Sequence, residues 1–201
     1  MGKNLERLNN TRDKGMVQYF YHSPSSKFPI RDVLNEQRKG YKTEPHIEIG
    51  AENFCFECYQ NNIKKFVERK LNYLFLITTC KNKEVNEKYG RGTNQFIVGY
   101  IIKSEILNVE GHICVKGSTY IYSFEDSILV KDIFGFNFDR SRLLKNPFVN
   151  ETQTGKILKH FQTRDNILNE CIKEIKDKDK RNKTCKYGEK CKFRSECLRF
   201  P

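Results

Sequence analysis

The sequence predicts an α+β protein in which a mixed or antiparallel, barrel-like β-sheet is flanked by helices and followed by a cysteine-rich tail. Three observations lead to this prediction. Strand-like apolar runs between residues 71 and 136 follow one another without an intervening helical segment. Segments with helical spacing lie on both sides of these runs, and three evenly spaced cysteines lie near the end of the chain.

Charge and composition divide the chain into three segments. Residues 1–45 hold nine Lys and Arg against five Asp and Glu, and residues 171–201 hold eleven against five, whereas residues 46–170 are nearly balanced. We therefore expect a basic, irregular N-terminal arm with one short helix near residues 30–37, a folded core and a basic cysteine-rich tail. Clustered positive charge attracts phosphates and releases their counterions, so both ends indicate a polyanionic partner. A surface that is basic only for solubility is the alternative.

Hydrophobic spacing predicts the first half of the core. Residues 52–70 have the spacing of a helix. Residues 71–80 form a nearly continuous run of aromatic and β-branched side chains, which is typical of a strand buried on both faces. A polar loop is expected over residues 81–94, and a strand over residues 95–107. Within this strand, Gly99 indicates a bulge or a close approach of another backbone.

The second half of the core is predicted in the same way. Residues 112–124 are expected to form a hairpin with its turn at Lys116-Gly117-Ser118, and residues 127–136 form a further apolar run. From Thr154 to residue 180 the spacing is helical, with one apolar stripe along the helix. Because the strands follow one another directly, a mixed or antiparallel sheet is favoured over a doubly wound one.

The eight cysteines are interpreted from the expected compartment. The first residues are polar and no window is apolar enough to span a membrane, so we expect a soluble, cytoplasmic protein. In a reducing cytosol, cysteines are buried apolar residues or metal ligands, although intracellular disulfides of hyperthermophiles are an exception. Cys80 and Cys114 lie inside apolar strands and are expected to be buried.

The final segment, "CKYGEKCKFRSEC", predicts a metal site. Cys185, Cys191 and Cys197 are spaced at intervals that allow their sulfur atoms to converge on zinc, or alternatively on a 4Fe–4S cluster. A fourth ligand must come from the folded body. Cys171 is the first choice because it is nearest in the chain, and the other candidates are Cys55, Cys58 and His160. For Cys55 and Cys58 the alternative is one turn of a helix that faces the core.

The strand region resembles the PUA-like superfamily, which includes the PUA, ASCH, EVE and YTH domains. The resemblance rests on "FLITTCKN", similar to the first barrel strand leading into a ligand-side loop, and on "FIVGYIIKSEI", similar to the "IVGIAEV"-like strand of such barrels. It covers residues 68–135 and implies a PUA-like β-barrel that binds RNA or modified nucleic acid without catalysis. The chain contains no Trp, on which the base-binding cage of YTH domains depends.

The resemblance implies a base-binding pocket built from Tyr or Phe, for which the candidates are Tyr73, Tyr100, Tyr120 and Phe124. Residues 88–94 have the composition of a rim, with glycines for backbone approach, an arginine for phosphate and a tyrosine for stacking. A flexible loop and ordinary core packing are the alternatives. The residues expected to contact nucleic acid are Tyr89, Arg91, Asn94, Tyr100, Lys103, Tyr120, Lys186, Lys192 and Arg194.

The tail has two further resemblances. "CKYGEKCKF" resembles the middle of CCCH zinc fingers, but Ser195 stands where the final histidine is expected. "CKFRSEC" resembles the end of the iron–sulfur staple in RecB-like nucleases, but the acidic and lysine residues of that active site are not found in this chain. The nuclease activity is therefore not expected here.

These observations favour a nucleic-acid-binding protein of the cytoplasm, with RNA or modified DNA as its partner, a structural metal and no membrane association. The first alternative is a metal-dependent or iron–sulfur enzyme that acts on nucleic acid. The second is a non-catalytic interaction module with a structural metal. Common catalytic motifs are absent from the sequence, and Glu125-Asp126 is expected to face solvent. An enzyme is therefore the less favoured hypothesis.

Overall fold

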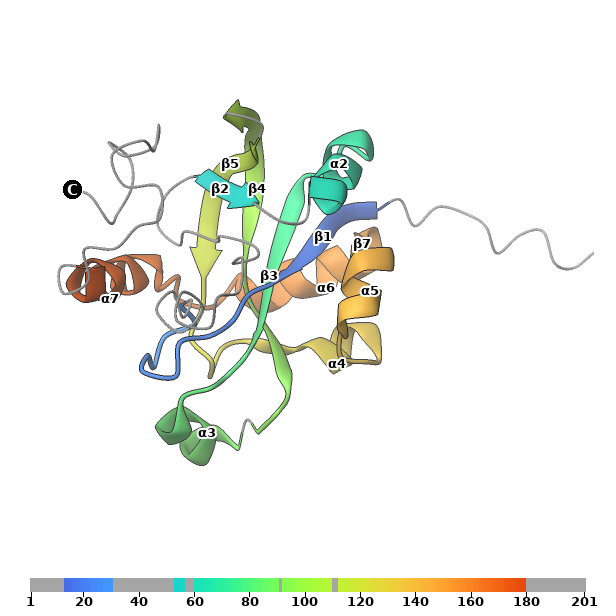
Figure 1. The fold of residues 1–201 in the computed structure, drawn as a ribbon. Coiled ribbons are helices and arrows are strands. Elements are labelled where there is room, and N and C mark those ends of the chain that lie inside the picture. Colours follow the sequence, from blue (N-terminus) through green and yellow to red (C-terminus); the bar gives the residue numbers. More distant parts are fainter. Residues whose placement is uncertain (1–12, 31–52, 57–59, 91, 110–111, 180–201) are drawn as a thin grey trace, which may run out of the picture.

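The computed structural model describes residues 13–30, 53–56, 60–90, 92–109 and 112–179 of the 201-residue chain (Figure 1). The elements are β1 (Asp13–Tyr19), β2 (Asn53–Phe56), α2 (Gln60–Glu68), β3 (Tyr73–Thr79), α3 (Lys83–Tyr89), β4 (Gln95–Val109), β5 (His112–Ile121), β6 (Ile128–Leu129), α4 (Val130–Phe134), α5 (Arg140–Lys145), β7 (Phe148–Asn150), α6 (Glu151–Phe161) and α7 (Leu168–Asp179).

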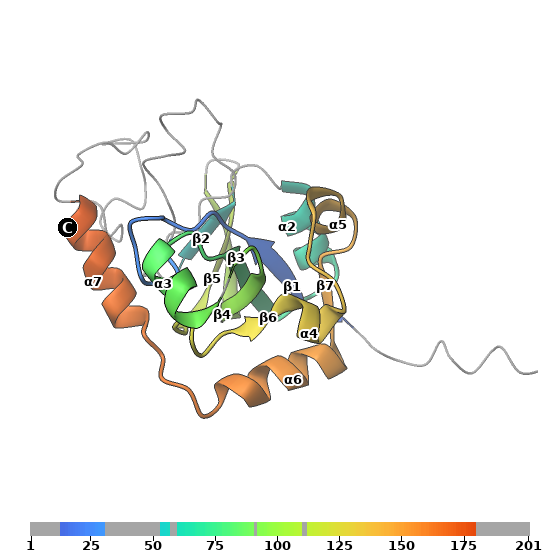
Figure 2. The ribbon, with the colours of Figure 1, turned by 90° about the horizontal axis from the view of Figure 1, so that it is seen from below.

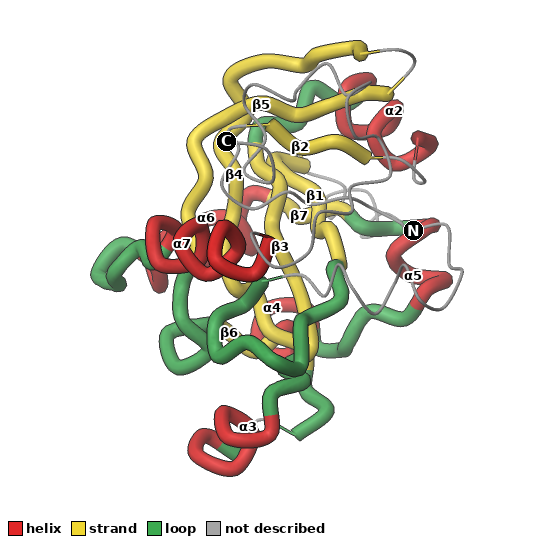
Figure 3. Tube along the Cα trace, turned by 60° about the vertical axis from the view of Figure 1, so that its left-hand side comes forward, coloured by secondary structure: helices red, strands yellow, loops and turns green. Residues whose placement is uncertain are grey.

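One mixed sheet organises the described part of the chain. Its strand order is β2-β5-β4-β3-β1-β7, with β6 paired to β4 beside this path. Strands β1 and β3 are parallel, and the other neighbours are antiparallel. The predicted α+β class and mixed sheet are confirmed. Figure 3 shows the strands as one layer with α3 beyond one end of it.

The expected barrel is not present, because the sheet is open. Closure would require the end strands β2 and β7 to pair, and within the described residues they do not. Both end strands are short. Helices α4 and α6 instead cover one face of the sheet, as Figure 2 shows.

The sheet separates two hydrophobic cores. The first core includes Met16, Phe66, Leu74, Leu76 and Cys171, and it receives α2 and α7. The second core includes Val17, Phe75, Ile77, Ile157 and Phe161, and it receives α6. Side chains of a strand point alternately to the two faces, so β1 and β3 contribute to both cores. This confirms that residues 71–80 contain a strand buried on both faces.

The expectation of an irregular arm was wrong for residues 13–19, which form β1 between β3 and β7. The residues after β1 are also folded against the body. The backbone N–H of Lys81 donates to His22 Nδ1 at 2.9 Å, so Nε2 carries the proton and donates to the carbonyl oxygen of Phe28 at 2.8 Å. The short helix expected near residues 30–37 lies almost wholly outside the described residues.

The helix expected over residues 52–70 is only partly present. Residues 53–56 form β2, in which Cys55 pairs with Cys114 of β5, and the helix α2 begins at Gln60. Cys55 is therefore not on a core-facing helix, and Cys58 lies outside the described residues. Pairing with β5 over a long sequence separation outweighs the local helical pattern here.

The expected polar loop over residues 81–94 contains the helix α3. The Asn82 side chain accepts a hydrogen bond from the backbone N–H of Val85, which caps the start of the helix. Gly90 ends it in the left-handed conformation, with φ of 58°. The two capping residues bound a helix whose polar composition had suggested a loop.

The predicted strand over residues 95–107 is confirmed as β4. Its pairing with β3 shifts register at Gly99, as expected, and a Cβ added there would overlap the carbonyl oxygen of Tyr120. The expected hairpin at 112–124 is wrong, because β5 continues through Gly117. Gly117 is needed for another reason: a Cβ at this position would overlap the carbonyl oxygen of Ile102 in β4.

The helix expected from Thr154 to residue 180 is divided into α6 and α7. Helix α6 begins earlier, with Asn150 as its N-cap and a capping box to Gln153. It ends at Phe161, and α7 begins at Leu168 on the other side of the sheet. Helix α7 therefore spans the expected boundary between core and tail at residue 171.

Candidate nucleic-acid-binding face

Three tyrosines on neighbouring strands share one face of the sheet. In the register of β3, β4 and β5, Tyr100 pairs with Phe75 on one side and with Tyr120 on the other, and Tyr73 pairs with Ile102. Residues directly opposite in a sheet point to the same face. The three tyrosines are each partly exposed, and Ile102 is 37% exposed. We call Tyr73, Tyr100, Ile102 and Tyr120 the tyrosine face.

The rings of the tyrosine face contact one another. The ring centroids of Tyr100 and Tyr120 are 4.9 Å apart with an interplanar angle of 21°, so the two rings are stacked across the strands. Tyr73 meets Tyr100 at 6.5 Å in an edge-on arrangement. Such cross-strand aromatic pairs stabilise a sheet by roughly 0.2–1 kcal/mol each, which holds the rings in a defined arrangement.

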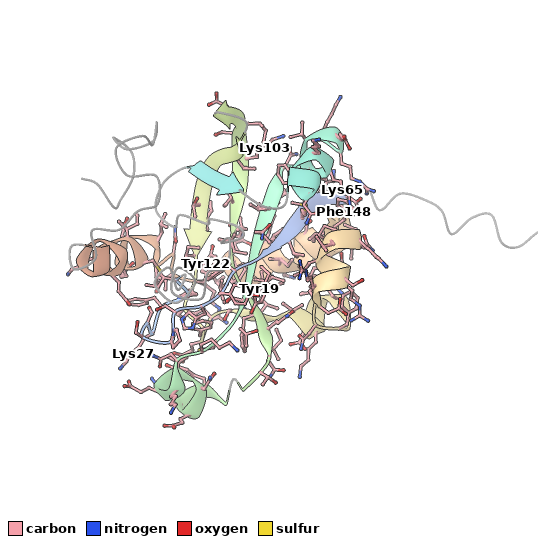
Figure 4. All side chains as sticks on the ribbon, viewed as in Figure 1. Tyr19, Lys27, Lys65, Lys103, Tyr122 and Phe148 are labelled. Carbon is pink, nitrogen blue, oxygen red and sulfur yellow. The ribbon has the colours of Figure 1, made fainter. Side chains whose placement is uncertain are left out.

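Helix α6 forms the inner boundary of the tyrosine face. The rings of Tyr122 and Phe161 stack at a centroid distance of 4.0 Å and an angle of 7°. Both side chains are buried. The ring centroid of Tyr122 (labelled in Figure 4) lies 6.2 Å from that of Tyr100. Phe161 is the last residue of α6. The helix therefore covers this part of the face, whereas the outer tyrosines, Tyr73, Tyr100 and Tyr120, stay partly exposed.

The phenol groups beside this boundary stay neutral at physiological pH. Burial raises the pKa of Tyr122, and a hydrogen bond to Tyr100 raises it further. Burial also raises the pKa of Tyr100, although the hydrogen bond with Tyr122 acts in the opposite direction. Neutral rings place no negative charge on this face, so it does not repel a phosphate-bearing ligand.

The structure brings together only part of the predicted nucleic-acid contacts. Tyr100 and Tyr120 lie side by side with Tyr73, as expected for a common surface. Phe124 does not belong to it, because it is buried in the first core with its ring 4.8 Å from His22. Lys103 follows Ile102 in β4 and so points to the opposite face, where its Nζ lies 5.9 Å from the ring of Phe66.

The predicted rim lies apart from the tyrosine face. Tyr73 begins β3, whereas residues 88–94 follow the other end of that strand, where Figure 1 shows α3. The Tyr89 hydroxyl donates to a carboxylate oxygen of Glu125 at 2.8 Å, and its ring packs against the first core. Asn94 is partly exposed, and Arg91 lies outside the described residues.

Cys171 is placed in the first core and is fully buried. Burial raises the pKa of its thiol to about 12, with smaller contributions from Glu174 and Glu170. The thiol is therefore neutral at physiological pH and packs with the apolar side chains of the first core. The predicted burial of Cys80 is confirmed, and His160 Nε2 lies 2.7 Å from the carbonyl oxygen of Asp126.

Apart from Cys55 in β2, the rest of the predicted metal site lies outside the described residues, as do three further predicted nucleic-acid contacts. These positions are Cys58, Cys185, Cys191, Cys197, Lys186, Lys192 and Arg194. Within the described ranges, no group of three or more His, Cys, Asp and Glu side chains is arranged to hold a metal ion. The zinc or 4Fe–4S site therefore stays a prediction.

Sequence reasoning named the tyrosines but missed Ile102 as part of the same surface. The alternation of Tyr73 with Phe75, and of Tyr120 with Tyr122, indicates that each pair shares a face of its strand. The sequence carries no signal for where α6 ends on that face. The exposure of the outer tyrosines is therefore visible only in the folded structure.

Comparison of the chain with protein-family models, with curated proteins and with solved structures finds no match. Among the described residues, no helix is long and apolar enough to cross a membrane. The residues of the sheet and its helices are therefore the basis for the function proposed below.

Proposed function

We propose that this protein binds single-stranded RNA or DNA by stacking unpaired bases on the tyrosine face. The observation that carries this proposal is the set of three partly exposed tyrosine rings on neighbouring strands. Aromatic side chains displayed on a sheet are a recurring platform for unpaired bases. Each stacked base contributes roughly 1–3 kcal/mol, and every base has a π-face that can stack.

Two further features support the proposal. The net charge of +12 favours association with a polyanion and makes the binding sensitive to salt. The resemblance to PUA-like domains covers residues 68–135, and β3 and β4 within it carry Tyr73 and Tyr100. RNA or a base-modified nucleic acid is the ligand that this resemblance implies, although the open sheet departs from the closed barrel of that superfamily.

The enzyme alternative has less support at the paired acids Glu125 and Asp126. The Glu125 carboxylate accepts a hydrogen bond from Tyr89. The Asp126 carboxylate accepts one from the Ser123 hydroxyl at 2.9 Å, and it lies 3.6 Å from the Arg164 guanidinium. Both carboxylates are thus engaged in contacts that join neighbouring segments of the fold, which supports a binding function over catalysis.

Replacing tyrosines of the tyrosine face tests the proposal. We expect Tyr120→Leu and Tyr100→Leu each to weaken binding of a fluorescein-labelled single-stranded RNA or DNA by about 5- to 100-fold, the equivalent of one lost stacking contact. Fluorescence anisotropy measures the dissociation constant. Tyr120→Phe keeps the ring and is expected to bind like the wild type.

Tyr21→Leu is the matched control, because Tyr21 is 56% exposed and does not belong to the tyrosine face. This variant is expected to bind like the wild type. Circular dichroism spectra of all variants test whether the fold is retained. Wild-type affinity in both Tyr100→Leu and Tyr120→Leu, or a wild-type protein that binds neither RNA nor DNA, would contradict the proposal.

A further inference from the structure

Helices α2 and α5 form one surface, although they are far apart in the sequence. The Asn62 side chain donates to the carbonyl oxygen of Leu143 at 3.1 Å, and Lys65 Nζ donates to that of Leu144 at 3.0 Å. Both acceptors are carbonyls near the C-terminal end of α5, where the helix dipole favours a cation. Figure 2 shows the two helices side by side.

Basic side chains dominate this surface. We call Lys64, Arg69, Lys70, Arg140, Arg142 and Lys145 the basic surface; all six are exposed. The acidic residues within the two helices and their caps are Glu68 and Asp139. Asp139 is in part committed to the helix itself, because its carboxylate caps α5 by accepting from the backbone N–H of Arg142 at 2.7 Å. The surface therefore carries a clear excess of positive charge.

Two arginines of the basic surface, Arg69 and Arg142, are held in place by contacts with the rest of the fold. Arg69 pairs with Asp13, and its guanidinium lies 3.7 Å from the ring centroid of Phe148 (labelled in Figure 4). Arg142 lies 4.5 Å from the ring centroid of Phe136 and donates to the carbonyl oxygen of Asn137 at 3.2 Å. Contacts with aromatic rings keep these guanidinium groups pre-organised, which suits recognition of phosphate.

The remaining four cations have no acidic partner among the described residues. No ion pair within the described part of the chain involves Lys64, Lys70, Arg140 or Lys145. Unpaired cations gathered on one rigid surface create a positive potential that attracts polyanions and concentrates them near the surface. When such a cation neutralises a phosphate of a nucleic acid, about one counterion condensed on the nucleic acid is released.

We infer that the basic surface binds the phosphodiester backbone of the nucleic acid whose bases stack on the tyrosine face. The inference rests on the proposed function for the identity of the ligand. Helix α2 packs on the first-core side of the sheet and the tyrosine face lies on the second-core side. The bound strand would therefore pass round the end of the sheet at the start of β3, where Lys70 precedes Tyr73 by three residues. An anionic membrane is a poorer fit, since among the described side chains of α2 and α5 the exposed large apolar ones are Val67 and Leu144.

The test removes three unpaired cations at once, in Lys64→Ala/Arg140→Ala/Lys145→Ala. We expect this variant to bind the labelled single strand about tenfold more weakly at moderate salt. The slope of log affinity against log salt concentration is expected to become shallower by about 2, the equivalent of three lost phosphate contacts. The control, Lys83→Ala/Lys131→Ala/Lys173→Ala, removes the same charge from exposed positions on α3, α4 and α7 and is expected to keep the wild-type slope.

The tyrosine variants separate this inference from the proposed function. Tyr120→Leu is expected to weaken binding at every salt concentration and to leave the slope unchanged. If wild-type protein binds and Tyr120→Leu weakens binding, but the triple variant keeps the wild-type slope, the basic surface is not the phosphate site. If the triple variant instead loses only its binding to phosphatidylserine vesicles, the surface is a membrane contact and the inference is overturned. Wild-type protein that binds no nucleic acid overturns both proposals.

Discussion

Cys171 lies on α7 with its side chain packed in the first core beside apolar groups from the central strands. Burial is the main reason that its thiol has a pKa of about 12, well above its usual range. The group is therefore a neutral thiol at physiological pH. Thiolates are the form that binds metals and reacts with electrophiles, so the position of this cysteine in the fold determines its chemistry.

We expect Cys171 to resist alkylation by iodoacetamide at pH 8 in the folded protein and to react once the chain is unfolded. Site-resolved mass spectrometry measures both rates. The raised pKa also predicts how stability changes with pH: the unfolded thiol ionises near pH 9, whereas the folded one keeps its proton to about pH 12. The contribution of Cys171 to stability is therefore full below pH 9 and is lost as the pH rises toward 12.

Cys80 is the matched comparison for the alkylation experiment, because its side chain is also buried. It is expected to be protected in the same way. Equal alkylation rates of Cys171 in folded and unfolded protein would contradict its burial. Protection of Cys171 that disappears on treatment with a chelator would instead indicate a metal ligand.

At the level of the elements, the β4–β5 pair depends on two glycines. Gly99 and Gly117 lie where the backbones of the two strands approach too closely for a side chain. Gly99 faces the backbone of Tyr120, and Gly117 faces that of Ile102. The same pairing places Tyr100 opposite Tyr120, so these glycines also support the arrangement of the tyrosine face.

Gly117→Ala is expected to lower the free energy of unfolding by about 2 kcal/mol or more, because the added Cβ overlaps a backbone atom that cannot move without breaking strand pairing. Urea denaturation followed by circular dichroism measures the change. Gly155→Ala is the matched control: Gly155 is exposed in α6, and an added Cβ there has no neighbour within 4 Å. It is expected to raise the free energy of unfolding by about 0.5–1 kcal/mol. A neutral Gly117→Ala variant would show that the strands can separate at no cost.

At the scale of the whole molecule, the sheet is assembled from distant parts of the chain. Strand β1, near the N-terminus, lies between β3 and β7 and contributes Met16 and Val17 to the two cores. Helix α7, which begins 149 residues after the end of β1, closes the first core through Cys171. The fold therefore requires residues on both sides of the segment that composition alone identifies as the core.

A fragment of residues 46–170 is expected not to fold. It lacks β1 and most of α7, so the pairing edges of β3 and β7 and the apolar side chains of the first core are left uncovered. A fragment of residues 46–201 tests the loss of β1 alone and is also expected not to fold. Urea titrations followed by circular dichroism provide the measurement, with the full-length chain as the control. A cooperative transition of residues 46–170 at the full-length midpoint would refute this prediction.

Local patterns in the sequence were sufficient for several features. The continuous apolar run at residues 71–80 predicts β3, and the strand-like run that starts at residue 95 predicts β4 with its irregularity at Gly99. Each of these signals depends on neighbours in the chain, because burial on both faces requires apolar side chains at successive positions. Tyr100 and Tyr120 were named for a different reason: the resemblance to PUA-like domains implies a base-binding pocket built from Tyr or Phe.

The features that local patterns missed depend on distant partners. Gly117 suggests a turn by its composition, but the nearby backbone of β4 makes it a strand residue. Residues 53–56 follow a helical pattern, but pairing with β5 makes them a strand. In both cases the energy of a contact with a distant part of the chain outweighs the local preference. Helix α3 is different: its polar composition resembles a loop, but its local caps, Asn82 and Gly90, bound a helix.

The sequence alone was thus enough for the α+β class, the two central strands β3 and β4, and the tyrosines that they and their neighbour carry. The strand order, the open sheet, the tyrosine face and the union of α2 with α5 became visible only in the tertiary structure. The physical reason is that periodicity reports which side of an element is apolar, whereas exposure and charge clustering depend on which elements cover one another. Helix α6 ends at Phe161, which stacks on Tyr122, whereas Tyr73, Tyr100 and Tyr120 stay partly exposed.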